Sequence, residues 1–179
     1  LAAFAGRRKL VEALLRRGAD ANARSLGADP NAIRMRDGPR PPVCADATPL
    51  HYACLGVRTS RSEAVEALLK GGASPHRRDE HGSTPLHVCC HRGVEGAALA
   101  LLKAASEKPL TDLSEGASAS DRDTAYASRR DYVERFSPLH RLAQSGRPDW
   151  APSNLIRRLV EASADVHSLS RRGLTPLHV

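Results

Sequence analysis

Apolar residues recur at helical spacing in short stretches that polar segments separate. The first stretch carries one apolar stripe at helical period, formed by Leu10, Val11, Leu14 and Leu15. It runs into the string Leu14-Leu15-Arg16-Arg17-Gly18-Ala19-Asp20, and similar strings occupy 68–74 and 159–165. We predict that each string closes an amphipathic helix, which Gly18 and Gly72 stop in the first two copies. The polar segments 73–83 and 164–174, each with one late glycine, predict β-turn connections.

A second string marks the start of further helices. Its four copies are Thr48-Pro49-Leu50-His51, Thr84-Pro85-Leu86-His87, Ser137-Pro138-Leu139-His140 and Thr175-Pro176-Leu177-His178, which begin 36, 53 and 38 residues apart. A Thr or Ser hydroxyl can cap the amides of a first helical turn, and proline fits the next position because its missing N–H needs no partner there. The leucine then enters the core, and small residues after it let neighbouring helices approach closely. We predict a short helix from each copy. Glycine ends this first helix at Gly6 in the partial opening repeat, and at Gly93 and Gly146 after the second and third copies.

The two strings keep a fixed phase and together resemble the ankyrin repeat, which has a period of about 33 residues and a Thr-Pro-Leu-His motif. The separation is 12 residues both from Gly72 to Thr84 and from Ser163 to Thr175. The resemblance implies an all-α solenoid of stacked helix-turn-helix units, with β-turn fingers that project to one side. It also implies a concave binding surface made of the fingers and the first helices.

The phase of the strings divides the chain into repeats and insertions. Partial repeats are expected at 1–24 and 170–179, fuller ones at 43–78, 79–105 and 137–169, and long insertions at 25–42 and 106–136. Smaller insertions are expected near 57–62 and 147–152. The opening Leu1 and the closing Val179, which lies within the last motif region, indicate a fragment of a longer protein.

The two long insertions differ in composition. Residues 25–42 contain Gly38-Pro39-Arg40-Pro41-Pro42, which excludes a helix and favours polyproline structure. Ser106–Arg130 is rich in Ser, Ala, Asp and Glu, and we expect it to be mobile, whereas Tyr132, Val133 and Phe136 could pack again. Such insertions are neutral surface growth, because loop length costs little free energy, or they serve a partner. In the second case the later insertion is a partner-specific arm or a loop regulated by phosphorylation at Ser114, Ser118 or Ser120.

Composition and charge narrow the classes of function. Only 3 % of residues are aromatic, so the core must consist of Leu, Val and Ala, and few side chains could stack on bases. The net charge of +7 is concentrated in 1–24 and 137–179, and with so few aromatic residues we interpret it as a solvated arginine face, with nucleic acid or anionic lipid as the less favoured alternative. We find neither a signal-peptide pattern nor an apolar stretch of about 18 residues. The four cysteines lack Cys-x-x-Cys spacing, so we expect reduced thiols in an intracellular protein, cytoplasmic or nuclear.

One cluster could supply metal ligands, namely His81, His87, Cys89, Cys90 and His91. However, His87 belongs to the repeated motif, where we expect its ring to bond to the backbone and the cap. Cys89 and Cys90 occupy positions suited to small core residues. Phosphate loops and the metalloprotease, hydrolase and kinase signatures are absent as well. We therefore expect no enzyme, no cofactor and no metal site.

The sequence predicts a protein-interaction scaffold, monomeric as an array, that binds other proteins on its concave finger and first-helix surface. The alternative is a targeting module of a larger enzyme or channel whose catalytic part lies outside these residues. Repeat phase assigns partner contacts to finger tips and to exposed first-helix positions, which are Tyr52, Leu55, Arg78, Glu80, His81, Ser83, His91, Arg92, Gln144, Ser145, Leu169, Arg171, Arg172 and Leu174.

Overall fold

A computed structural model describes residues 2–26, 45–56, 62–107, 126–145 and 153–179. Most of the insertion expected at 25–42, and nearly all of those expected near 57–62 and 147–152, fall outside these residues. The same holds for Cys44 and Gly146 and for the three candidate phosphorylation sites Ser114, Ser118 and Ser120.

The described residues form α-helices and one short 3-10 helix, with no strand among them. The elements are α1 (Arg8–Arg16), α2 (Pro49–Leu55), α3 (Ser62–Lys70), α4 (Pro85–Arg92), α5 (Glu95–Glu107), η2 (Tyr126–Ser128), α7 (Pro138–Ala143) and α8 (Ser153–Glu161). None of the helices described is both long and apolar enough to cross a membrane. The predicted all-α class is confirmed.

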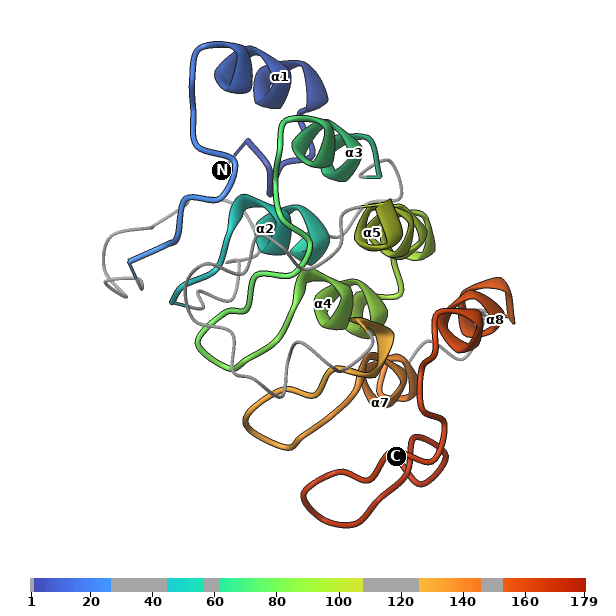
Figure 1. Ribbon diagram of the computed structural model, residues 1–179. Coiled ribbons are helices and arrows are strands. Elements are labelled where there is room, and N and C mark those ends of the chain that lie inside the picture. The colour runs from blue at the N-terminus through green and yellow to red at the C-terminus, as the bar shows by residue number, and fades with distance from the viewer. Residues whose placement is uncertain (1, 27–44, 57–61, 108–125, 146–152) are drawn as a thin grey trace.

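The helices lie in two rows (Figure 1). One row holds α2, α4 and α7, and the other holds α1, α3, α5 and α8, with contacts between consecutive helices of each row. Contacts between α2 and α3 and between α4 and α5 join the two helices of one repeat. The loops that lead from one helix pair to the next extend to the same side of the stack (Figure 1). This is the predicted solenoid with fingers.

Three of the four predicted first-helix starts agree with the structure: the copies at Thr48, Thr84 and Ser137 start α2, α4 and α7 at the proline, with the Thr or Ser as an extended N-cap residue. The prediction of a helix from the fourth copy is wrong for this structure, because residues 176–178 form a turn, although the Thr175 N–H still donates to Nδ1 of His178 at 3.3 Å. Gly93 ends α4 in the left-handed conformation, where its N–H donates to the carbonyl of Cys90 at 3.2 Å. After the second helices, Gly18 and Gly72 have positive φ angles of 86° and 91°. Ser163, at 65°, takes the equivalent place in the last copy.

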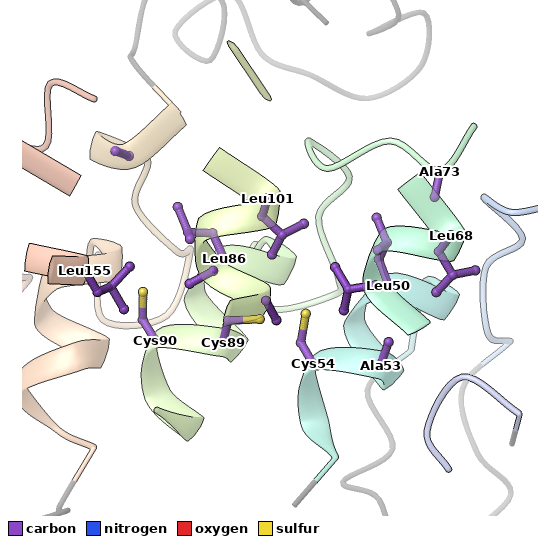
Figure 2. Close-up of a cluster of buried hydrophobic side chains, with 14 of the residues drawn as sticks. Leu50, Ala53, Cys54, Leu68, Ala73, Leu86, Cys89, Cys90, Leu101 and Leu155 are labelled. Atoms are coloured by element: carbon purple, nitrogen blue, oxygen red, sulfur yellow. The ribbon is translucent and has the colours of Figure 1, made fainter. Parts of the chain in front are cut away.

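The core lies between the two rows of helices. Figure 2 shows its leucines together with smaller residues that leave room for close helix contacts. The labelled leucines Leu50, Leu68, Leu86, Leu101 and Leu155 are all at most 3 % exposed. Between them lie buried small residues of the first helices, which are Ala53, Cys54, Cys89 and Cys90. Leucine, alanine and valine thus make up most of the core, as the composition predicted, and buried cysteines add to them.

The connection before α7 is packed over a longer stretch than its composition indicates. From Tyr126 onwards the chain contacts the preceding repeat: the Tyr126 hydroxyl donates to the carbonyl of Pro75 at 2.9 Å, and its ring meets His76 edge-on. Ala127 and Arg129 are at most 1 % exposed. The expected mobile stretch Ser106–Arg130 therefore differs from the structure at both ends, since α5 includes residues 106–107 and residues 126–130 form the base of a finger.

Candidate functional site

Each complete copy of the motif builds a reciprocal hydrogen-bonded box at its helix start. In α4 the backbone N–H of Thr84 donates to Nδ1 of His87 at 3.2 Å, and the Thr84 hydroxyl accepts from the backbone N–H of His87. The boxes of α2 and α7 have the same geometry. Because Nδ1 accepts a bond from the backbone, the ring proton must be on Nε2. The prediction that the motif histidine bonds to the backbone and the cap is confirmed.

The Nε2–H group of each motif histidine then ties one repeat to the finger of the next. His51 donates to the carbonyl of Ser83 at 3.0 Å, and His140 donates to the carbonyl of Leu174 at 3.0 Å. His87 reaches two carbonyls of the fourth finger, those of Arg129 and Phe136, at 3.0 and 3.1 Å. The motif histidines therefore hold the fingers against the first helices of the preceding repeats.

Burial keeps the rings of His51 and His87 neutral. It lowers the pKa of His51, and likewise the pKa of His87, from 6.5 to about 4. For His87 the charge of Asp131 opposes this lowering of the pKa, whereas Arg78 and Arg141 add to it. Both ring nitrogens are already engaged, so these histidines have no free atom for acid–base chemistry and act as structural residues.

The fingers bond to one another in a continuous row. Ser25 and Ala47 pair at the N-terminal end, where the backbone N–H of Ser25 donates at 3.0 Å. The N–H of Glu80 donates to the carbonyl of Ala45 at 3.1 Å, which links the second finger to the third. Two further links complete the row: Tyr132 N–H to the His81 carbonyl at 2.8 Å, and Arg171 N–H to the Glu134 carbonyl at 2.7 Å. We call these linked segments the finger row, comprising 22–26, 45–47, 78–83, 130–136 and 169–174.

The fourth finger is also held from inside by a buried carboxylate. Oδ1 of Asp131 accepts the backbone N–H groups of Glu134 and Phe136 at 3.0 and 3.3 Å. Oδ2 pairs with the Arg141 guanidinium of α7 at 2.8 Å, and the Asp131 side chain is fully buried. The Phe136 ring stacks on His140 at a centroid distance of 5.1 Å. This finger is therefore fixed to the helix that it precedes.

The structure places the predicted partner-binding residues in three groups. Glu80, His81, Arg171 and Arg172 are exposed on the finger row, beside the half-exposed Leu169 and the half-buried Leu174. His91 and Arg92 end α4 and Gln144 and Ser145 follow α7, so these four lie at the far ends of neighbouring first helices. Tyr52 and Leu55 are half-buried on α2.

Two of the predicted residues have structural partners. Ser83 is only 8 % exposed, its N–H donates to Asp79 at 2.8 Å, and its carbonyl accepts from His51. The Arg78 guanidinium donates to the carbonyl of Arg130 at 2.8 Å and lies 5.1 Å from the centre of the Tyr132 ring. Both residues belong to the frame that holds the finger row, and contact with a partner stays a prediction for them.

The sequence-predicted set did not include the exposed tip of the fourth finger. Tyr132 and Val133 are 56 % and 46 % exposed there, and Arg135 stands beside them with a positive φ of 56°. Gly82 and Gly173 occupy the matching place in the third and fifth fingers, with φ of 73° and 72°. Because arginine stands where the other fingers have glycine, the segment lacks their sequence signature. The remaining sequence signal for a finger here was its position just before Ser137, the start of the next motif copy.

The candidate metal ligands do not converge. The His87 ring serves the box described above, Cys89 and Cys90 are fully buried between helices, and His81 and His91 are exposed. The thiols of Cys54 and Cys89 contact each other (Figure 2), and burial raises the pKa of Cys89 and Cys90 well above the usual range. In the part of the chain that the structure describes, no three His, Cys, Asp or Glu side chains gather to hold a metal.

An apolar hollow of about 320 Å³ lies between the first two repeats. Alanines of the segments before and after α1 line much of it, together with apolar side chains of α1, Leu68 of α3 and Tyr52 of α2, and Asp20 and Arg24 also border it. The predicted contact residue Tyr52 lines this hollow, so it lies apart from the exposed finger tips.

Comparison with known families identifies the repeat. A family described as ankyrin repeats (3 copies) matches residues 1–112, which is more than half of the chain. This match covers α1 to α5 and so includes the second and third fingers described above.

Curated relatives resemble parts of the chain. The nuclear factor NF-kappa-B p105 subunit of Gallus gallus is 30 % identical over 133 residues, which is 74 % of this chain and 11 % of that protein. NF-kappa-B inhibitor alpha of Sus scrofa is 48 % identical over 46 residues, 26 % of this chain and 14 % of its own length. Protein phosphatase 1 regulatory subunit 27 of Homo sapiens is 38 % identical over 63 residues, 35 % of this chain and 39 % of its own length. The chain thus spans well under half the length of each.

Proposed function

This chain belongs to the ankyrin-repeat family, a family of protein-interaction modules, and we propose that it binds its protein partners on the finger row and the adjoining exposed ends of the first helices. The linked fingers are the observation that carries this proposal. Each finger is bonded to the next through backbone groups, and the third, fourth and fifth fingers are also bonded to a first helix of the preceding repeat through a buried histidine. A surface held in this way loses little conformational freedom when a partner binds.

The relatives support a regulatory, non-catalytic role. One is named an inhibitor of NF-kappa-B and another a regulatory subunit of protein phosphatase 1, so each name describes action on another protein. We propose that this chain likewise acts by occupying a partner. The alternative role, as a targeting module of a larger enzyme or channel, would use the same surface.

Surface charge favours a protein over a nucleic acid as the partner. Several arginines at the two ends of the stack pair with carboxylates of their own helix, as in Arg8 with Glu12 at 2.7 Å and Arg158 with Glu161 at 3.1 Å. These pairs reduce the free positive charge available to phosphates or anionic lipid headgroups. A steep fall of duplex DNA binding with added salt would speak for nucleic acid instead.

An intracellular site and a monomeric array complete the proposal. Cys54, Cys89 and Cys90 are all free thiols, which fits a reducing compartment. Sedimentation of the chain as a single monomeric species would support the monomer, and a concentration-dependent dimer would contradict it.

Matched charge reversals test the surface. A finger variant carries Glu80→Lys, Arg171→Glu and Arg172→Glu. A control variant carries Glu107→Lys, Lys103→Glu and Arg157→Glu on the second-helix row, with the same change in net charge and on similarly exposed side chains. The proteins that co-purify with each would be compared by mass spectrometry. We expect the finger variant to lose partners that the control keeps, and the reverse pattern would refute the proposed surface.

A further inference from the structure

The tip of the fourth finger presents a rigid aromatic platform. The Tyr132 ring lies on Gly82 so closely that an added Cβ at this glycine would come within 2.4 Å of the ring carbon Cγ. The Arg78 guanidinium lies 5.1 Å from the ring centre, and the Tyr132 N–H donates to the His81 carbonyl. Despite these contacts, 56 % of Tyr132 is exposed. The ring is thus supported by the third finger and open to solvent elsewhere.

Val133 extends the platform, and its support is equally firm. It is 46 % exposed, and the finger beneath it is fixed by the Asp131–Arg141 pair and by the buried Phe136. Rigid, amphipathic tyrosines on a pre-ordered frame are efficient contact residues, because little side-chain entropy remains to be lost on binding. Apolar side chains this exposed at a fixed finger tip are suited to contact an apolar residue of a partner.

The charges around the platform are not symmetric. Arg135 of this finger and Arg171 and Arg172 of the fifth finger are all exposed, and the Glu134 carboxylate lies 3.6 Å from the Arg172 guanidinium. The Arg171 guanidinium reaches the carbonyl of Val133 at 3.4 Å, so a positive charge stands directly beside the apolar pair. Towards the third finger the exposed tip residues are Glu80 and His81. An occupant would therefore meet positive potential on one side of its apolar anchor and a carboxylate on the other.

We propose that Tyr132, Val133, Arg135, Arg171 and Arg172 form a docking site for an extended segment of a partner protein that carries an aromatic or large aliphatic anchor flanked on one side by acidic residues. The anchor covers Tyr132 and Val133, and the acidic residues face the arginines of the fifth finger. This inference rests on the proposed function, since it specifies which chemistry the finger row selects in a partner.

Selection from random peptides tests the site without a known partner. The chain would be used to select from a library of random peptides displayed on phage, and an enriched peptide would be synthesised with fluorescein for polarisation titrations. We expect enriched peptides to share an aromatic or large aliphatic residue with acidic residues to one side. Enrichment of basic peptides, or of none, would overturn the inference.

Matched variants then locate the binding. Tyr132→Ala is expected to weaken binding of the selected peptide about tenfold. Val133→Ala should weaken it several-fold, whereas Val166→Ala, the same change at an equally exposed valine outside the platform, should leave affinity unchanged. Arg171→Glu with Arg172→Glu does not touch the core and should switch the selected flanks from acidic to basic. Equal affinity for wild type and Tyr132→Ala, or unchanged selection by the double variant, would contradict the site.

The outcomes separate the two proposals. If the finger variant loses its co-purifying proteins while the selection yields no anchor with acidic flanks, the finger row binds partners but this site is wrong. If the finger variant keeps every co-purifying protein, both proposals fail.

Discussion

Acidification should unfold this protein by protonating the two histidines that join neighbouring repeats. In His51 and His87, Nδ1 accepts the N–H of the N-cap threonine, and both residues are 1 % exposed. Protonation of Nδ1 would place its new N–H against the N–H of the N-cap threonine, so the hydrogen bond between them would be lost. It would also place a positive charge in the core. The folded pKa of about 4 lies below the ordinary 6.5, so the unfolded chain takes up protons first as pH falls. Stability is therefore complete above pH 6.5 and is lost as the pH approaches 4.

The magnitude follows from the same values. One pKa unit corresponds to about 1.4 kcal/mol, so each histidine removes on the order of 3 kcal/mol between pH 6.5 and 4. Partial burial and the charges of Arg141 and Arg92 also lower the pKa of His91, which adds to the same trend. Two such losses are comparable to the whole stability of a typical domain, about 5–15 kcal/mol.

Urea unfolding followed by circular dichroism at neutral and mildly acidic pH would measure this loss. His51→Gln gives a decisive comparison, because glutamine can still accept the N-cap N–H in such a box but does not titrate. We expect this variant to be less stable at neutral pH, since it loses the bond to the Ser83 carbonyl. Its stability should then depend less on pH.

His167→Gln provides the control, since His167 is exposed and outside the boxes. It should retain the full pH dependence. An unfolding free energy of the wild type that is the same at pH 7 and near pH 5, or an unchanged slope in His51→Gln, would refute the reasoning.

Three further results are expected. Gly82→Ala and Gly173→Ala both force alanine into a left-handed conformation at a cost of about 1–2 kcal/mol. Only at Gly82 would the new Cβ also clash with Tyr132, so urea unfolding should show a larger loss of stability for Gly82→Ala. Equal losses of stability in the two variants would contradict this packing. Asp131→Asn should lower stability by about 2 kcal/mol, because it leaves the partly buried Arg141 without its carboxylate, and an unchanged midpoint would argue against this pair. Three of the four thiols should react with Ellman's reagent only on unfolding, since burial raises the pKa of two of them and all three are enclosed; fast reaction of the native protein would contradict this.

Much of the fold could be predicted because each local signal agrees with the long-range packing. Proline after Thr or Ser, followed by the Leu-His of the motif, favours a helix start for local reasons, so the starts at Pro49, Pro85 and Pro138 could be predicted from the chain alone. Gly18 and Gly72 mark helix ends for a similarly local reason, a left-handed turn residue.

The base of the fourth finger depends instead on distant partners. Tyr126 bonds to Pro75, 51 residues away in sequence, and Arg129 presents its carbonyl to His87, 42 residues away. The surrounding composition favours disorder and carries no sign of these contacts. Repeat phase predicted contact positions on the fingers, but it did not include the exposed pair Tyr132–Val133, because exposure depends on how one finger lies on the next.

The histidine ties also bear on how much extra chain this architecture tolerates. The bond from a motif histidine to the following finger closes 32 residues from His51 to Ser83, 34 from His140 to Leu174 and 49 from His87 to Phe136, at nearly the same length. By polymer theory the longer closure costs only about 0.4 kcal/mol more than the shortest. The distance between neighbouring repeats is therefore set by these contacts and does not depend on how many residues connect them. A reporter domain inserted between α5 and η2 should therefore be tolerated, because α5 packs on α4 and α8 and η2 is held by the bond from Tyr126 to Pro75.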